Sequence, residues 1–243
     1  MRWFTENFRF ITLALLVSMI ASGCGAIRVT RAGEMKTETH SVDLGGATSA
    51  RVRIEMGFGE LKIDSAGGKL MEGTFNYNVA EWQPQVSYSI AGSQGTLLIS
   101  QPDEDTNLIN QGGQNRWDLR LSDSVPIDLE ISTGAGTSEL NLSAIGLTGL
   151  KIETGAGNGT FDLAGDWDHD LSVTIRGGVG NVTVILPREI GVRVAVTSGI
   201  GSLETAGLMK DGDVYINDAF GKTPQTLHLE IEAGIGAINL QVR

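Results

Sequence analysis

The sequence has a single cysteine, five prolines and few aromatic residues among its 243 residues. One cysteine excludes a disulfide scaffold. The scarcity of proline, together with the absence of a strict Gly-X-Y period, excludes collagen. Aromatic residues make up only 6% of the chain, so Val, Ile and Leu must fill most of any core. With 41% hydrophobic and 19% charged residues, the composition is that of a folded protein rather than a disordered one.

Positive charge is also in short supply. The chain has 18 Lys and Arg against 29 Asp and Glu, which gives a net charge of −11. This balance argues against binding to nucleic acid, or to an anionic membrane, through a broad basic patch. It suits a soluble domain of the cell envelope, and we expect no nucleic-acid partner.

The N-terminus has the features of an export signal. Arg2 and Arg9 flank the start, and an apolar run of about twelve residues follows over 10–21. That length fits a signal peptide and is too short to span a membrane. Removing residues 1–23 takes away two arginines and one glutamate, so the mature chain carries −12.

Ala21, Ser22 and Gly23 precede Cys24, and this arrangement resembles the lipobox of bacterial lipoproteins. The resemblance implies that Cys24 becomes the acylated N-terminus, detectable by palmitate labelling, and that the other three residues are recognised by the processing machinery. Because several acyl chains anchor a protein stably, we expect an exported protein that a lipid anchor holds at the cell membrane or the outer membrane. The alternative is an ordinary signal peptide cut nearby, which leaves a free thiol.

Glycine is abundant, and twelve of the 33 glycines lie in a repeated Gly-h-Gly tripeptide in which h is apolar. Each copy follows a run of alternating apolar and polar residues, such as Ile127, Leu129 and Ile131, which is typical of a half-buried strand. The twelve glycines are Gly57, Gly59, Gly134, Gly136, Gly155, Gly157, Gly178, Gly180, Gly199, Gly201, Gly234 and Gly236.

The alternation resumes after each tripeptide, but it is shifted by one residue. Met56 and Phe58 share one parity, whereas Leu61 and Ile63 have the other. A one-residue shift turns every later side chain to the opposite face of a strand. A bulge or corner at the second glycine would correct the facing, because glycine readily adopts positive φ. We therefore interpret the twelve glycines as structural corners.

The spacing of the later copies indicates a repeat architecture. Their first glycines follow one another at intervals of 21, 23 and 21 residues and then 35, which leaves room for an insertion near 208–224. A period near twenty residues is typical of a solenoid, in which stacked repeats share one core. The predicted fold is all-β, a single-stranded β-solenoid-like array in which each repeat gives two short strands joined at the corner. A β-sandwich is the alternative.

Several of these segments resemble a known family. Residues 125–129 (VPIDL) and 150–152 (LKI), each leading into a Gly-Ala-Gly corner, resemble the bacterial toast-rack β-solenoid proteins, whose C-terminal domain is similar to that of LiaF-type cell-wall-stress proteins. Residues 56–61 (MGFGEL) and 75–78 (FNYN) are similar to the family's N-terminal segment. The resemblance covers about residues 40–243.

The resemblance implies a non-catalytic envelope domain, of unknown function or adhesin-like. LiaF-type proteins restrain a sensor kinase, which implies a link to the cell-envelope stress response. They carry membrane helices before this domain, where the present chain has only its expected lipid anchor.

These features divide the chain into four predicted parts. Residues 1–23 are the lipoprotein signal peptide, and residues 24–36 are a tether. Residues 37–115 form an N-terminal β-rich toast-rack region that ends in a polar loop over 101–115. Residues 116–243 form the C-terminal β-solenoid repeats.

The densest group of candidate metal ligands is Asp166, Asp168 and Asp170. Alternating Asp residues begin an EF-hand loop, but Leu171 stands where that loop needs glycine and Gly177 where it needs the final glutamate. We interpret this segment, and the acidic run over 103–105, as solvated turns. The three histidines, His40, His169 and His228, are dispersed and form no zinc-binding set. We expect no metal or other cofactor.

No motif for catalysis is present either. The Gly-h-Gly corners lack the third glycine of a dinucleotide loop, and no Gly-X-Ser-X-Gly elbow occurs. We therefore expect a non-catalytic protein that binds or senses an envelope protein or glycan. The alternative is an enzyme or binding module that acts on cell-wall or extracellular glycan, with Trp82, Trp117 and Trp167 as candidates for stacking on sugar rings.

Overall fold

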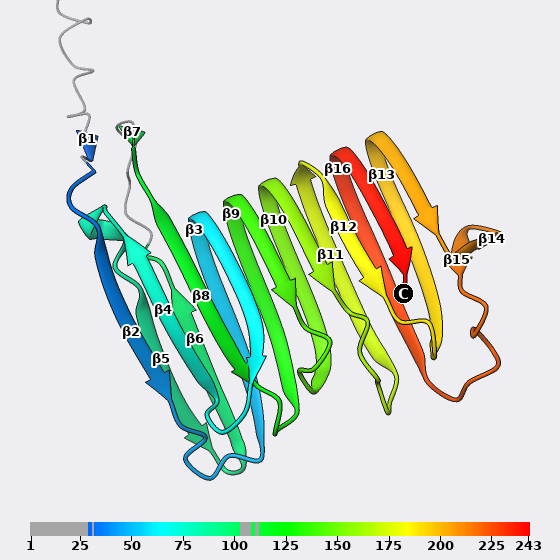
Figure 1. Ribbon diagram of the computed structural model, residues 1–243, viewed down its shortest axis with the longest axis horizontal. Helices are drawn as coiled ribbons and strands as arrows, with labels where there is room; N and C mark the ends of the chain where they lie inside the picture. The colour runs from blue at the N-terminus through cyan, green and yellow to red at the C-terminus, as the bar shows by residue number, and fades with distance from the viewer. Residues whose placement is uncertain (1–28, 31, 103–107, 110–111) are drawn as a thin grey trace, which may run out of the picture.

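The computed structural model describes residues 29–30, 32–102, 108–109 and 112–243, which form a rack of bent β-strands (Figure 1). The described part of the chain has one helical turn, a 3-10 turn at Ala80–Trp82, and contains no helix long and apolar enough to cross a membrane. The strands are β1 Val29–Thr30, β2 Lys36–Val42, β3 Ser49–Ala66, β4 Met71–Tyr77, β5 Gln85–Ala91, β6 Gln94–Ser100, β7 Leu108–Ile109, β8 Asn115–Ser122, β9 Ile127–Asn141, β10 Leu147–Asp162, β11 Leu171–Val179, β12 Val182–Leu186, β13 Gly191–Ala206, β14 Met209–Asp211, β15 Val214–Ile216 and β16 Thr226–Val242.

The repeating unit is one long strand that bends at its Gly-h-Gly tripeptide. β3, β9, β10, β13 and β16 pass through the bend unbroken, and only the coil of β11 and β12 is divided there. The expectation of two short strands per repeat is therefore wrong for five of the six coils. Neighbouring coils stay paired in parallel register through the bend, as at Ala156 opposite Ala135 and Gly157 opposite Gly136. This continuity distinguishes the β-solenoid-like array from a β-sandwich, whose two sheets are made of separate strands.

Positive φ at the second glycine accompanies the predicted change of facing. The φ angle lies between 138° and 145° at Gly59, Gly136, Gly157, Gly180 and Gly236, whereas Gly201 in β13 lies outside this range. Apolar side chains of both arms consequently point inward.

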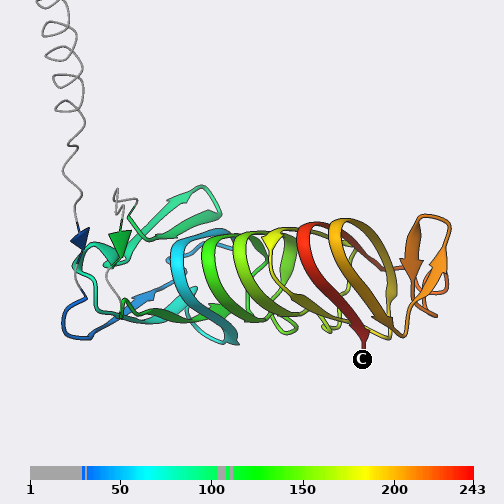
Figure 2. The ribbon, with the colours of Figure 1, turned by 90° about the horizontal axis from the view of Figure 1, so that it is seen from above.

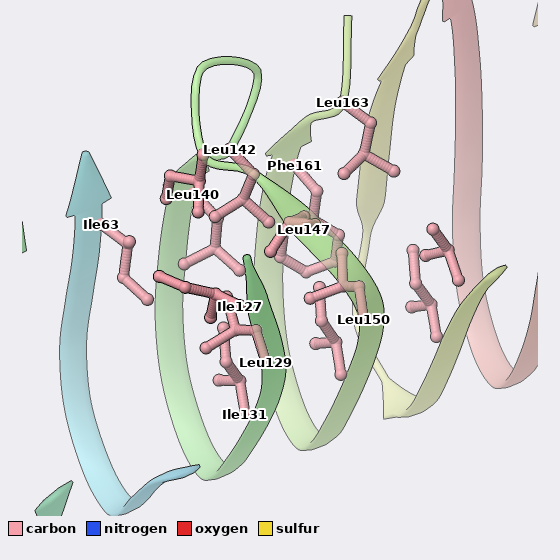
Figure 3. Packing of buried hydrophobic residues seen from close by; sticks show 14 of the residues in the cluster. Ile63, Ile127, Leu129, Ile131, Leu140, Leu142, Leu147, Leu150, Phe161 and Leu163 are labelled. Carbon is pink, nitrogen blue, oxygen red and sulfur yellow. The ribbon is translucent and has the colours of Figure 1, made fainter. Parts of the chain in front are cut away.

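The core lies between the two arms of the coils. In Figure 3, Ile127, Leu129 and Ile131 from the first arm of β9 lie in one cluster with Leu140 from its second arm, and each is at most 1% exposed. Burying each such side chain contributes about 1.5–3 kcal/mol. Since each coil shares this core with its neighbours, the array gains its stability by stacking.

The coils do not stack in the order of the sequence. Their spatial order is β3, β9, β10, β11 with β12, then β16, and finally β13. The chain leaves β12, skips one position to form β13, makes the antiparallel hairpin β14–β15 within the predicted insertion, and returns to place β16 in the gap (Figure 1). The C-terminal strand is thus an interior strand that pairs with coils on both sides.

The end of the rack nearest the N-terminus is covered by two groups of strands. The first arm of β3 pairs with β6, which pairs with β5. The second arm of β3 pairs with β8, β8 pairs with β4, and β4 pairs with β2. Figure 2 shows these strands and the β14–β15 hairpin at opposite ends of the elongated array.

Candidate functional site

The corner glycines form two rows that cross the rack at the bend. A Cβ added at Gly155 or Gly157 would lie less than 3.0 Å from the carbonyl oxygen of Gly134 or Gly136 in the neighbouring coil, closer than real Cβ atoms are found. The same close approach to a neighbouring glycine recurs in every coil after β3. The structure thus places the predicted corner glycines where the backbones of adjacent coils touch.

A groove crosses the outer surface along the first of these rows. It has a volume of about 850 Å³ and is floored by glycines from five coils, Gly57, Gly134, Gly155, Gly178 and Gly234. Because strands in a sheet lie about 4.8 Å apart, the groove is roughly 20 Å long. The groove exists because the glycine row has no side chains, whereas the residues on both sides of the row do.

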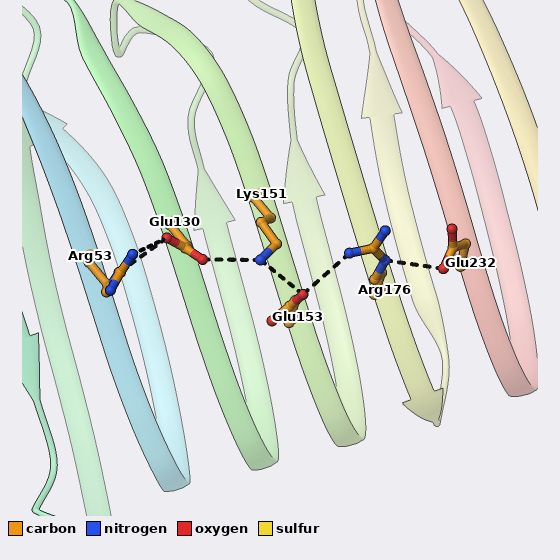
Figure 4. A network of polar contacts seen from close by, with 6 residues as sticks. All are labelled: Arg53, Glu130, Lys151, Glu153, Arg176 and Glu232. Carbon is orange, nitrogen blue, oxygen red and sulfur yellow. Dashed lines mark hydrogen bonds and ion pairs between the residues drawn. The ribbon is translucent and has the colours of Figure 1, made fainter.

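A ladder of alternating charges crosses the coils beside the groove (Figure 4), and Glu153, Arg176 and Glu232 from this ladder line the groove. The Arg53 guanidinium binds Glu130 at 2.9 Å, and Lys151 Nζ binds both Glu130 Oε1 at 3.1 Å and Glu153 Oε1 at 3.0 Å. Arg176 continues the ladder to Glu153 at 3.6 Å and to Glu232 at 3.1 Å. These side chains are partly exposed, so each pair contributes at most about 1 kcal/mol. The ladder therefore orders the surface more than it stabilises the fold.

The charges of the ladder reinforce one another. The hydrogen bond from Lys151, and then that from Arg53, holds the pKa of Glu130 below its usual value, although burial opposes this. Glu153, followed by Glu130, raises the pKa of Lys151. Glu130 and Lys151 consequently stay charged at neutral pH.

An apolar ridge runs along the other side of the first glycine row. The middle residues of the six tripeptides face one another across paired coils, in the order Phe58, Ala135, Ala156, Val179, Ile235 and Ile200. Val179, Ile235 and Ile200 are 54%, 51% and 72% exposed. Exposed apolar side chains gathered in one place are typical of a surface that contacts another molecule.

Two polar side chains that the sequence analysis assigned to a plain loop close the first corner. Gln101 Oε1 accepts hydrogen bonds from the backbone N–H groups of Gly57 and Phe58, at 3.1 and 3.3 Å. Asn115 donates from Nδ2 to the Phe58 carbonyl at 2.8 Å and is only 4% exposed. These side chains take the place of a preceding coil. The sequence carried no signal for them, because their partners are backbone groups more than forty residues away.

The acidic turn does not gather its carboxylates around one point. Asp168 Oδ1 lies 2.7 Å from His169 Nδ1, whereas Asp170 Oδ1 accepts the backbone N–H of Thr226 at 2.8 Å. Among the residues with described positions, no group of three His, Cys, Asp or Glu side chains is arranged to hold a metal ion, and Asp166 belongs to none. The acidic run over 103–105 lies outside the described residues, as do Ala21, Ser22, Gly23 and Cys24.

His169 ties this turn to the neighbouring coil. Its Nδ1 faces Asp168, and its Nε2 lies 2.8 Å from the carbonyl oxygen of Leu147. Both partners are acceptors, so the arrangement is fully satisfied only by the doubly protonated ring. The hydrogen bond to Asp168 is the main cause that raises the pKa of His169, and burial partly opposes it.

We expect the pH dependence of stability to carry the signature of His169. A raised folded-state pKa gives a stabilisation that is complete below the unfolded-state pKa of about 6.5 and is lost as pH rises through the higher folded-state value. Chemical denaturation at a series of pH values should show this loss in the wild type and a flatter profile in His169→Gln. His228→Gln is the control, because His228 has no such partners. Equal profiles for the wild type and His169→Gln would contradict the assignment.

The tryptophans suggested for sugar stacking are not available for it. Trp82, Trp117 and Trp167 are 3%, 0% and 5% exposed. Trp167 donates Nε1–H to the Leu163 carbonyl at 3.0 Å and closes the turn between coils. That expectation is therefore wrong, because these rings fill the core and its covering turns.

Comparison with known proteins places this architecture. A family model described as the N-terminal domain of toast_rack, DUF2154, matches residues 31–185. A crystal structure of a candidate cell adhesion protein from Clostridium sporogenes is 32% identical with a TM-score of 0.81, over 86% of this chain and 100% of that chain. No curated protein matches the sequence at a significant level.

More distant structures carry no functional argument. A candidate adhesin from Bacteroides fragilis is 9% identical with a TM-score of 0.29, over 86% of this chain and 99% of that chain. A candidate lipid-binding protein from Parabacteroides distasonis is 11% identical with a TM-score of 0.32, over 89% and 100% of the two chains.

Proposed function

The chain belongs to the toast-rack family, and from that premise we propose that it is a non-catalytic, adhesin-like protein of the cell envelope that binds another protein through the groove at its corners. The observation that carries the proposal is the groove itself. It is lined by the ladder charges Glu153, Arg176 and Glu232 and lies next to the exposed apolar ridge, along a glycine row that leaves the backbone open to a ligand.

The chemistry of the groove favours a protein segment over a glycan. Glycan-binding surfaces stack sugar rings on exposed aromatic faces, and the three tryptophans considered for that task are buried. An extended segment with charged and apolar side chains would meet complementary groups on the ladder and the ridge. The relative from Clostridium sporogenes, described as a candidate cell adhesion protein, agrees with a binding role.

Retention on envelope preparations tests the proposal. Ser132 lines the groove, so Ser132→Trp should fill it and reduce binding by on the order of tenfold, the equivalent of about 1.4 kcal/mol. Thr160→Trp is the matched control, because Thr160 is exposed on the second arm of the adjacent coil, away from the groove. Binding that survives protease treatment of the envelopes and is abolished by glycan digestion would favour the glycan alternative instead. Binding that Ser132→Trp leaves unchanged would exclude the groove.

We also propose that Cys24 anchors the protein to the membrane. The lipobox resemblance of Ala21, Ser22 and Gly23 supports this, as does the place of β2 at one end of the rack, where a tether would leave the groove accessible. Fatty-acid labelling and membrane fractionation should both be lost in Cys24→Ala. Equal secretion of the mutant and the wild type as soluble, unlabelled protein would contradict the anchor. Recovery of a sensor kinase with the anchored protein would extend the proposal to envelope-stress signalling.

A further inference from the structure

The outer edge of the bend in β13 is open, at the end of the rack far from β2. β13 is the last coil, and β16 covers its inner side over the whole strand. On the outer side β15 pairs only with Arg193–Ala195. Within the described ranges no strand pairs with the outer side of residues 196–206, which include both sides of the bend. Ile200, at the apex of the bend, is 72% exposed.

This edge lacks the usual protection against strand pairing. Natural edge strands are blocked by lysine, proline, bulges or covering elements. Residues 196–206 contain neither lysine nor proline, and Glu204 is their single charge. The opposite end of the rack is protected, because β6 and β8 cover β3, and Gln101 and Asn115 satisfy its corner. Among the described residues, the bend itself is therefore open at the β13 end and covered at the β3 end.

The shape of the edge restricts what can cover it. A straight peptide can pair with one arm but cannot follow the chain around the bend. A partner that covers both arms must itself bend, as β13 of a second copy does. Residues 196–199 and 201–204 are free of β15 and extend equally to either side of Ile200, so the edge can face itself across a two-fold axis at this residue.

We propose that two copies of this protein associate by antiparallel pairing of their β13 edges, with Ile200 opposite Ile200 of the partner subunit. This register places Val196 opposite the partner's Glu204. The interface is isologous, because each copy contributes the same residues. The proposal concerns a different surface from the groove and does not depend on the groove ligand.

The direction in which a Cβ atom would point at the two corner glycines of β13 agrees with a two-fold pairing. A Cβ at Gly199 or Gly201 would point toward Gly234 or Gly236, into the copy's own rack. In the antiparallel pair these positions face away from the interface in both copies. A parallel strand would instead point its Cβ atoms at the carbonyl oxygens of Gly199 and Gly201 and would need glycine at both places. A second copy in the antiparallel orientation avoids this steric clash with the carbonyl oxygens of Gly199 and Gly201.

The pairing also has a consequence for anchored molecules. β2 and β13 lie toward opposite ends of the strand order, so in the pair both N-terminal ends lie far from the interface. Two molecules that are anchored through their N-termini to two opposing membranes would associate through their β13 ends.

Disulfide trapping of the full chain in detergent micelles tests the register. Directly opposed residues in an antiparallel pair bring their Cβ atoms to about 4.5–5.5 Å, close to disulfide range. Ile200→Cys should give a covalent dimer under mild oxidation, at least about tenfold faster than Val179→Cys, a difference of about 1.4 kcal/mol. Val179 is exposed on the same ridge but lies two coils from the edge. Equal rates for the two variants would overturn the proposal.

Sedimentation equilibrium of the same preparation tests the association without a cross-link. The wild type should dimerise reversibly, and Ile200→Lys should be monomeric because the two-fold axis sets like charges opposite each other. Val179→Lys should dimerise as the wild type does. A wild type that stays monomeric at about 100 μM would have a dissociation constant weaker than this concentration, and this result would refute the interface. Dimerisation that Ile200→Lys leaves intact would refute it equally.

Discussion

Alanine at position 157 is expected to destabilise the rack severely. Gly157 has a φ of 141°, which side-chain-bearing residues rarely adopt, and its added Cβ would overlap the carbonyl oxygen of Gly136. Relief would require β9 and β10 to separate, but the two strands pair through the bend on both arms. The strain and the lost hydrogen bonds should cost more than about 4 kcal/mol. Loss on this scale removes a large share of the roughly 5–15 kcal/mol that stabilises a typical domain.

Two other glycines separate the causes. Gly212, in the β14–β15 hairpin, has a φ of 59° and nothing within 4 Å of an added Cβ, so Gly212→Ala should cost only the conformational term of about 1–2 kcal/mol. Gly155 has no positive φ, but its Cβ would overlap the Gly134 carbonyl oxygen. Gly155→Ala should therefore report the overlap alone and destabilise almost as much as Gly157→Ala.

Urea unfolding followed by tryptophan fluorescence measures these differences, because Trp117 and Trp167 are buried. The expected order of destabilisation is Gly157→Ala, then Gly155→Ala, then Gly212→Ala. If Gly155→Ala and Gly212→Ala had similar effects, contact between glycine rows would not limit the spacing of the coils.

The corners were predictable because their signal is local. The shift in parity between Met56 and Leu61 lies within a few residues, and a strand cannot keep both side chains inward without a bend. The all-β solenoid class followed from the repetition of that pattern. Its continuity through the bend was not predictable, because it depends on the backbone register between coils and not on side-chain alternation.

The order of the coils could not be obtained from the repeat. β13 and β16 both carry alternating apolar residues before a Gly-Ile-Gly corner, so either could follow β11. The structure shows what distinguishes them. Arg176 on β11 faces Glu232 on β16, whereas the corresponding residue of β13 is Thr197. A single partly exposed ion pair is too weak a signal to read before the pairing is known.

The groove was hidden for a related reason. Glu153, Arg176 and Glu232 are ordinary polar residues of alternating strands, and they come together at the groove only because parallel coils stack in register. The three tryptophans were suggested as a sugar-binding surface although they are buried, because the sequence does not distinguish an exposed ring from a buried one.

A chain that ends at Gln225 is expected not to fold. Truncation there removes β16, which supplies five residues to the core and pairs with β11, β12 and β13. The five residues are Leu227, Leu229, Ile231, Ile238 and Leu240, each at most 2% exposed. At about 2 kcal/mol for each buried side chain, the loss equals the whole stability of a typical domain. Circular dichroism and tryptophan fluorescence should show an unfolded chain.

Point substitutions in β16 provide the graded test. Leu229→Ala removes a core side chain that is 1% exposed and should destabilise by about 2–5 kcal/mol. Glu230→Ala, on the outward face of the same strand, should change stability by no more than about 0.5 kcal/mol. A truncated chain that still unfolded cooperatively would mean that β13 can close onto β11 without the inserted strand.

A buried asparagine stabilises the segment that connects β13 to β16. Asn217 is 3% exposed, donates Nδ2–H to the Ile190 carbonyl at 2.8 Å and accepts the Val192 N–H at 2.9 Å. These bonds join the start of β13 to the segment that returns toward β16. The position between β12 and β13 is occupied by β16, the last strand of the chain. Because only β16 fills it, the C-terminal residues decide whether the first four coils and β13 form one rack.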